Sequence, residues 1–257
     1  MDENLTPVEH EVTENEAEES VSIFSGFIDM FTSPWEVGKR TISSALKVLL
    51  LAILLETIVI AGISYFYSAS PGVRQEMFQM QTQVIDKMAK GPNFPKEKLP
   101  EMYAEIEKGL NFNPTKSIGI GLLTTALSIF GLGILFWICH RIFTAEPIKF
   151  MHLVGLVSYG AAISALGNLL TGLIQFFGDS MLMAPNLGFL VGVGDAGMFG
   201  VLSRVNIFTL WYYAAVGTAI ASAAGLSNKQ GYTIGGIAYG FLFLVTFGFM
   251  KLISTLF

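Results

Sequence analysis

The sequence has little charge and almost no cysteine. Charged residues make up 14% of its 257 positions, whereas soluble domains carry about 25%. Cys139 is the only cysteine in the sequence, which excludes a disulfide within the chain. The charges gather in the first 40 residues and between Arg74 and Lys116, and long stretches elsewhere are almost free of them. This distribution argues against a soluble enzyme and indicates a membrane protein.

The N-terminus lacks the basic residues of a secretory signal peptide. Its first nineteen residues contain eight acidic groups and no lysine or arginine, the opposite of the basic start of a signal sequence. Dense like charge and few apolar groups cannot offset the entropy of ordering, so we expect residues 1–20 to form a disordered acidic tail in the cytoplasm. The net charge of −5 argues against a nucleic-acid partner.

Five apolar runs are each long enough to cross a bilayer as a helix, because a hydrocarbon core of about 30 Å needs about 20 residues. Every backbone polar group inside lipid must be paired internally, which favours helices. We therefore predict an all-α integral membrane protein, with a bundle of five transmembrane helices within residues 41–257. The runs are Ser44 to Tyr67, Ser117 to Cys139, Phe150 to Phe177, Ile207 to Leu226 and Tyr232 to Phe257.

Two segments outside these runs also have helical patterns. Val21 to Phe31 places its apolar residues on one face and is too short to span, so we expect an interfacial helix and anchor within residues 21–40. Residues 68–116 carry two apolar helical faces separated by a turn at Gly91 and Pro92, which predicts a helical cap outside the cytoplasm. Aromatic and basic residues near span ends are typical interface anchors, and the candidates are Trp35, Lys39, Arg40 and Trp211.

The basic residues of the short loops favour a cytoplasmic N-terminus and an extracytoplasmic C-terminus. Cytoplasmic loops carry an excess of lysine and arginine, and the short loops on the N-terminal side hold Arg141, Lys149 and Lys229. The loop from Gly178 to Arg204, on the other side, contains Arg204 as its single basic residue. The longer 68–116 loop places seven basic residues on that other side as well, against this trend.

Small and polar residues inside the later spans predict close packing of the last three helices, because membrane helices associate through small residues and hydrogen bonds between helices. The third span has a polar stripe repeating every four residues, and the fifth span has two Gly-x-x-x-Gly pairs. These residues are Gly160, Ser164, Asn168 and Gly172, then Gly231 with Gly235 and Gly236 with Gly240.

Glu56 is an acidic side chain placed near the middle of the first predicted span. A carboxylate in hydrocarbon is costly, so such a residue faces the bundle interior and is a functional candidate. Two interpretations stay open for Glu56. It forms a structural hydrogen bond, with Asn168, Ser164 or Tyr159 as its partner, or it has a proton- or ion-linked role.

The sequence shows no nucleophile with its base, no phosphate loop and no His-Glu-x-x-His motif. Gly192, Gly194 and Gly197 match a dinucleotide fingerprint formally, but membrane spans flank them in place of a βαβ unit, so we predict no cofactor there. Four capable metal ligands surround one predicted turn, yet their spacing matches no established zinc site, and we predict no metal either. They are Cys139, His140, Glu146 and His152.

Three stretches carry a family likeness: Phe-Ile-Asp-Met-Phe-Thr-Ser-Pro-Trp-Glu-Val-Gly-Lys at Phe27 to Lys39, then Arg141 to Phe150, then Asn206 to Gly235. The chain resembles bacterial members of the Yip family, the Ypt/Rab-interacting membrane proteins, over nearly its whole length. The resemblance implies a five-helix bundle in the cell's inner membrane with a cytosolic N-terminus. Eukaryotic relatives bind prenylated Rab GTPases. Their acidic-Leu-Tyr-Gly-Pro motif is missing here, and Asn206 stands where many bacterial members have Asp, which argues against Rab binding.

These patterns favour a non-enzymatic membrane scaffold or adaptor. Its partners would be the lipid bilayer and another membrane protein or a second copy of the chain. The alternative is a small transporter or channel that uses Glu56 and the polar stripe of the third span. No internal repeat of the kind found in many secondary transporters is visible.

Overall fold

The computed structural model describes residues 23–256, apart from 43, 92, 93, 145 and 147. Within this part of the chain every regular element is a helix, and an isolated bridge pairs Asn186 with Asn206. The predicted all-helical class is therefore confirmed. The acidic tail expected at residues 1–20 lies outside the described residues.

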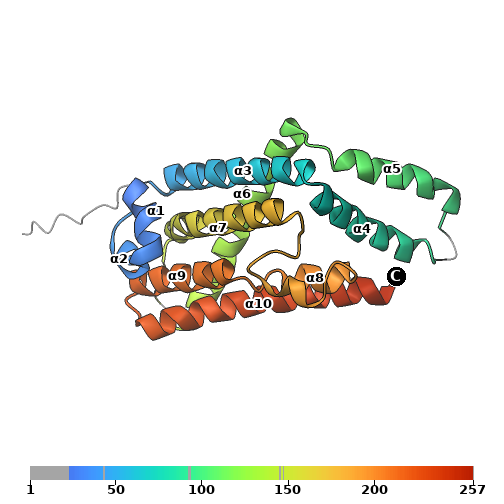
Figure 1. Cartoon of the computed structure of the whole chain (residues 1–257). Helices are drawn as coiled ribbons and strands as arrows, with labels where there is room; N and C mark the ends of the chain where they lie inside the picture. The colour runs from blue at the N-terminus through green and yellow to red at the C-terminus, as the bar shows by residue number, and fades with distance from the viewer. Residues whose placement is uncertain (1–22, 43, 92–93, 145, 147, 257) are drawn as a thin grey trace, which may run out of the picture.

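In the part of the chain that the structure describes, four helices are long and apolar enough to cross a membrane. They are α3 (Ala45–Ala69), α6 (Pro114–His140), α7 (Phe150–Gly178) and α10 (Asn228–Leu256), the last over its stretch Asn228–Phe249. Figure 1 shows α3, α7, α9 and α10 running side by side while α6 crosses behind them. Of the four, α7 is the most buried and forms the centre of the bundle.

The fourth predicted run forms a shorter helix than expected. Helix α9 (Ile207–Ala223) has 17 residues, or about 25 Å at 1.5 Å per residue. Gly225 ends it, because this residue has a positive φ of 67° and Leu226 donates back to the Ala221 carbonyl at 2.8 Å. That arrangement is a Schellman-type helix end, which glycine favours. At its other end the Asn206 side chain accepts from the Phe208 N–H at 2.8 Å.

Two short helices cover one end of the bundle. Helices α1 (Ile23–Thr32) and α2 (Pro34–Lys39) pack on α7 and α9 with Met30 and Val37 fully buried. Arg40 bridges Asp29 at 3.2 Å and joins the two helices. The helix expected near residues 21–31 is therefore present. Phe24 and Ile28 lie exposed on its outer face, as the apolar face of an interfacial helix would.

The opposite end of the bundle carries an arm of two helices. Helix α4 (Pro71–Met88) leads through the short turn η1 (Lys96–Lys98) into α5 (Leu99–Gly109), and Figure 1 shows this pair extending beyond the end of α3. Two helices, α4 and α5, thus lie within the 68–116 segment, while the predicted location of this segment outside the cytoplasm stays a prediction. We call them the arm, and the bundle end that bears them the arm end.

Hydrogen bonds attach α4 to the connection between α7 and α9, which contains η2 (Leu187–Leu190) and α8 (Ala196–Leu202). Asp179 accepts from the Ser70 hydroxyl and, at 2.8 Å, from the Gly72 N–H, so it caps the first turn of α4. One turn further along, Glu76 accepts from the Met181 N–H at 2.5 Å. The glycine-rich segment belongs to this connection, and no strand precedes it among the described residues.

The two glycine pairs of α10 have different surroundings. A Cβ atom added at Gly231 would lie 2.7 Å from Thr218 Cα, and one at Gly235 would lie 2.9 Å from the Tyr213 carbonyl carbon. These two glycines therefore let α9 and α10 approach closely, as predicted. Cβ atoms at Gly236 and Gly240 would meet nothing within 4 Å, so the second pair is not a packing face between the described helices.

Candidate functional site

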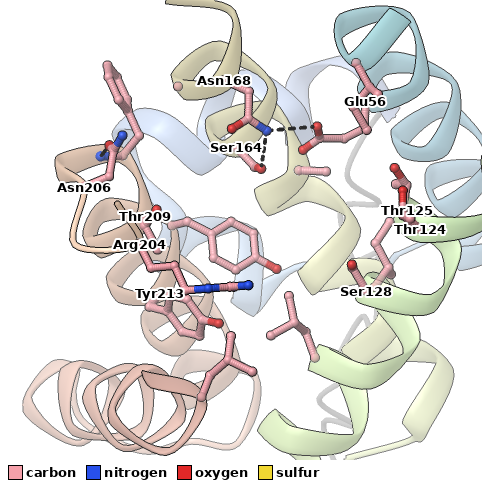
Figure 2. A pocket seen from close by; sticks show the side chains of 18 residues that line it. Glu56, Thr124, Thr125, Ser128, Ser164, Asn168, Arg204, Asn206, Thr209 and Tyr213 are labelled. Carbon is pink, nitrogen blue, oxygen red and sulfur yellow. Dashed lines mark hydrogen bonds between the residues drawn. The ribbon is translucent and has the colours of Figure 1, made fainter. Parts of the chain in front are cut away.

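A cavity of about 320 Å³ lies inside the helix bundle. Helices α3, α6, α7 and α9 supply most of its wall, and Arg204, Asn206 and Leu242 complete it (Figure 2). Its lining mixes apolar side chains with hydroxyl, amide and charged groups. The polar members are Glu56, Thr124, Thr125, Ser128, Ser164, Asn168, Arg204, Asn206, Thr209, Tyr212 and Tyr213.

Glu56 faces α7 from the α3 side of this cavity. Its side chain is 6% exposed, and its Oε2 atom accepts a long hydrogen bond of 3.5 Å from Asn168 Nδ2. The same nitrogen lies 3.4 Å from Ser164 Oγ. The structure therefore brings together the three intramembrane residues that the sequence singles out. Tyr159 is not a partner, because its buried hydroxyl has no hydrogen bond and its ring packs edge-on against Phe27.

Glycines on α7 set the position of Ser164 and Asn168. A Cβ atom at Gly160 would lie 2.8 Å from Tyr212 Cε2 on α9, and one at Gly172 would lie 2.8 Å from Ile63 Cγ1 on α3. These close approaches hold α7 against both neighbours. The four-residue stripe therefore has three parts: one glycine packs on α9, the other packs on α3, and the polar pair between them faces the cavity.

Arg204 is the charged cavity residue that the sequence did not predict. It precedes α9 by three positions and was counted among loop charges, yet Figure 2 shows its guanidinium directed into the cavity beside Tyr213 and Ser128. Among the described residues, Glu56 included, the guanidinium of Arg204 forms no hydrogen bond or ion pair, although it interacts electrostatically with Tyr213. Nothing local in the sequence marks it, because its direction depends on how the connection before α9 folds back over the bundle.

The weak metal candidates are divided between two places. Cys139 and His140 are buried at the end of α6, where His140 Nδ1 lies 3.3 Å from the Phe136 carbonyl oxygen. Glu146 and His152 instead line a separate surface pocket with Lys149. Among the described residues no three Cys, His, Asp or Glu side chains are grouped so that they could hold a metal ion.

The predicted interface anchors lie around α1 and α2. Lys39 Nζ lies 5.8 Å from the centre of the Trp35 ring and bridges Glu36 at 3.0 Å. Trp211 on α9 is 38% exposed, and its ring packs edge-on against that of Phe31 at 5.4 Å. Trp35 thus belongs to α2, and Trp211 contacts α1, the other helix of this pair.

The cavity combines one carboxyl, one guanidinium and several hydroxyl groups, a set suited to binding a polar group inside an apolar bundle. Ligand sites are typically concave and largely apolar, with a few polar groups that fix orientation. Apolar walls are present here too, in Ile60, Ile129, Leu132 and Leu242.

Comparison with known proteins gives one family and one relative. The family described as the Yip1 domain matches residues 28–250. Membrane protein YknW of Bacillus subtilis (strain 168) is 23% identical over 117 residues, which cover 45% of this chain and 50% of that protein. The chain therefore matches about half the length of this curated relative. No solved structure matches the chain significantly.

Proposed function

The chain belongs to the Yip1 domain family of membrane proteins, and from that premise we propose that it is a non-enzymatic adaptor, which holds another membrane protein through its arm. The observation that carries the proposal is the isolation of α5. This helix packs on α4 and η1, and none of its residues is buried. Folding a helix that buries so little stabilises the protein weakly, so we attribute its presence to binding.

The charges on α5 define the partner. Glu101, Glu105 and Glu107 are exposed on this helix, against the single lysine Lys108. Like charges four residues apart, such as Glu101 and Glu105, weaken an isolated helix. A basic surface would relieve that repulsion and would be attracted to the helix. The partner we propose is an integral membrane protein with a basic segment on the arm side of the bilayer.

The face of α5 turned toward α4 is already occupied. Tyr103 donates a hydrogen bond to Asp86 on α4, and its ring packs edge-on against that of Phe78 at 6.4 Å. Glu107 lies toward α4, where it lines a pocket with Arg74 and Phe78. Docking therefore uses the face of α5 that carries Glu101 and Glu105, and it leaves the contact between α4 and α5 intact.

Photo-crosslinking in cells tests this proposal. A photoreactive residue at Glu105 is expected to give one discrete heavier adduct, whereas the same residue at Tyr103 is expected to react within the chain. Glu101→Lys should abolish the adduct formed at position 105, because it reverses a charge on the docking face. An adduct that is absent, or that survives Glu101→Lys unchanged, would contradict an acidic docking face.

The proposal includes a membrane location and an orientation in that membrane. The protein would lie in the inner membrane with its N-terminus in the cytoplasm, its arm outside and α9 crossing the bilayer as a fifth span. In support, α9 packs along its length against α7 on one side and α10 on the other. Helix α9 is about 25 Å long, which is shorter than the hydrocarbon core. It would therefore cross where the bilayer is locally thinner, or the turn that follows it would complete the span.

A transport function is the alternative, and the cavity around Glu56 is the observation that favours it. Intramembrane carboxyl groups that face cavities are common in ion and proton pathways. Reconstitution into liposomes with proton and ion flux assays separates the two functions. Flux above that of empty vesicles would support transport, and its absence would leave the adaptor role as the one supported.

A further inference from the structure

We propose that the cavity binds the phosphate of a membrane phospholipid, with Arg204 as the residue that contacts it. The proposal does not depend on the adaptor role, because it rests on the cavity alone. Three observations carry it: an unpaired guanidinium, a cavity of head-group size, and apolar walls that continue onto the lipid-facing surface.

The guanidinium of Arg204 lacks a counter-charge. An arginine in a membrane domain normally faces a cavity and pairs with an acidic group or a carbonyl. Arg204 faces the cavity (Figure 2), yet its guanidinium forms no hydrogen bond or ion pair with the described residues. Glu56 does not neutralise it, because the Glu56 carboxyl is buried and turned toward Asn168 on α7. The cavity therefore presents a cation with five unused donors, a geometry that suits phosphate oxygens.

The polar groups near Arg204 add donors for the same anion. Ser128 and Thr124 on α6 line the cavity and remain exposed, as does Arg204 itself. The cavity is therefore open to its surroundings at this point. Arg204 lies three positions before α9, and it shares the cavity with residues from the middle turns of α3, α6 and α7. The first turn of α9 also carries the positive end of the helix dipole.

The size and walls of the cavity favour a lipid over a free anion. Its volume of about 320 Å³ is at the lower end of the range for small-molecule sites, which fits a head group and excludes the two acyl chains. Ile129 and Leu132 of α6 and Leu242 of α10 give the cavity apolar walls. The outer faces of the same two helices expose Leu127 and Leu244, along which acyl chains can lie.

The test uses the purified full-length protein in detergent, titrated with phosphatidylglycerol and followed by native mass spectrometry. Arg204→Gln removes the charge and is expected to weaken lipid binding about tenfold or more, as expected for a charge-assisted hydrogen bond. Ser128→Trp keeps Arg204 but fills the cavity, and should weaken binding as well. Lys116→Gln is the matched control: it removes an exposed positive charge from the first turn of α6, outside the cavity, and should leave binding within twofold.

Competition with inorganic phosphate distinguishes a lipid head group from a free phosphate ion as the bound anion. Bound phosphatidylglycerol should persist in excess inorganic phosphate, because the apolar walls contribute only to the lipid. Displacement by inorganic phosphate, with no preference for the lipid, would overturn the assignment to a phospholipid. Equal lipid binding by wild type and Arg204→Gln, or an equal loss in Lys116→Gln, would overturn the site. Arg204→Lys keeps the charge without the planar fork, so partial binding by this variant would support a phosphate contact even if Arg204→Gln folds poorly.

Discussion

The carboxyl group of Glu56 is held by a hydrogen bond of 3.5 Å from Asn168, and two substitutions test what that contact does. Glu56→Gln keeps the shape and an accepting oxygen, so it should change the free energy of unfolding little. Glu56→Leu removes the acceptor and should cost about 1 kcal/mol, the lower part of the range for an unpaired polar group. The cost is low because Asn168 keeps Ser164 as a neighbour at 3.4 Å and remains exposed to the cavity. Thermal unfolding in detergent measures both.

Glu56→Gln also separates the proposed functions. A folded, correctly inserted Gln variant should restore function to cells that lack the protein if the carboxyl is structural. Failure of a stable Gln variant to do so would show that its proton or charge is used, and would favour transport.

Asp179 gives a pH-dependent prediction for the arm. Hydrogen bonds from the Ser70 hydroxyl and the Gly72 N–H hold the pKa of this carboxyl below its ordinary value of 3.8. The folded pKa is lowered, so its stabilisation is fully present above that ordinary value and is lost as the pH falls through the lowered one. Amide hydrogen exchange in the first turn of α4 should thus lose protection only in acid. Asp179→Asn should show weaker protection at neutral pH and no such acid step, and an identical profile in both proteins would refute the cap.

At the scale of elements, two adjacent glycines on α10 test the packing of α9 on α10. Gly235→Ala places a Cβ atom 2.9 Å from the Tyr213 carbonyl carbon, and forcing α9 and α10 apart should cost about 1–3 kcal/mol. Gly236→Ala is the matched control, since its Cβ meets nothing within 4 Å. Alanine also favours a helix over glycine, so Gly236→Ala should be neutral or stabilising. Unfolding midpoints in detergent compare the pair, and equal losses would mean that α10 packs elsewhere.

The sequence predicted elements better than it predicted their ends and contacts. Long apolar runs give α3, α6, α7 and α10 directly, because lipid requires such length. The early end of α9 was missed, since the apolar run continues to Leu226 while Gly225 adopts a positive φ. Apolar periodicity alone does not predict that backbone conformation.

The features that the sequence did not predict depend on contacts between segments that are distant in the chain. Asn168 was one of three partners predicted for Glu56, because buried polar groups need hydrogen-bond partners, and the structure brings these two residues together. Arg204 was not expected in the cavity. Its position depends on the connection from α7 to α9, which is held by hydrogen bonds such as that from Gln83 Nε2 on α4 to the Val193 carbonyl at 3.0 Å. No local pattern encodes a pairing across so many residues.

At the scale of the whole molecule, the two ends of the bundle are covered by different elements. One end is closed by α1 and α2, which pack closely on α7 and α9, and the first turn of α10 lies there as well (Figure 1). The other end bears the arm and the α7–α9 connection. The acidic face of α5 belongs to the arm end (Figure 1), whereas the cavity of Arg204 is lined by the middle turns of α3, α6 and α7. The protein would therefore present its docking face to one side of the membrane.

Cysteine labelling tests the sidedness of the molecule and the crossing of α9 together. Glu97 lies in the arm and Lys229 in the first turn of α10 at the opposite end, and both are exposed. Helices α6, α7 and α9 separate them, so three crossings put these positions on opposite sides, whereas two crossings put them on the same side. In a Cys139→Ser background, an impermeant maleimide added to intact cells should label Glu97→Cys and leave Lys229→Cys protected. Labelling of 229 with protection of 97 would reverse the orientation, and identical behaviour at both positions would show that α9 does not cross.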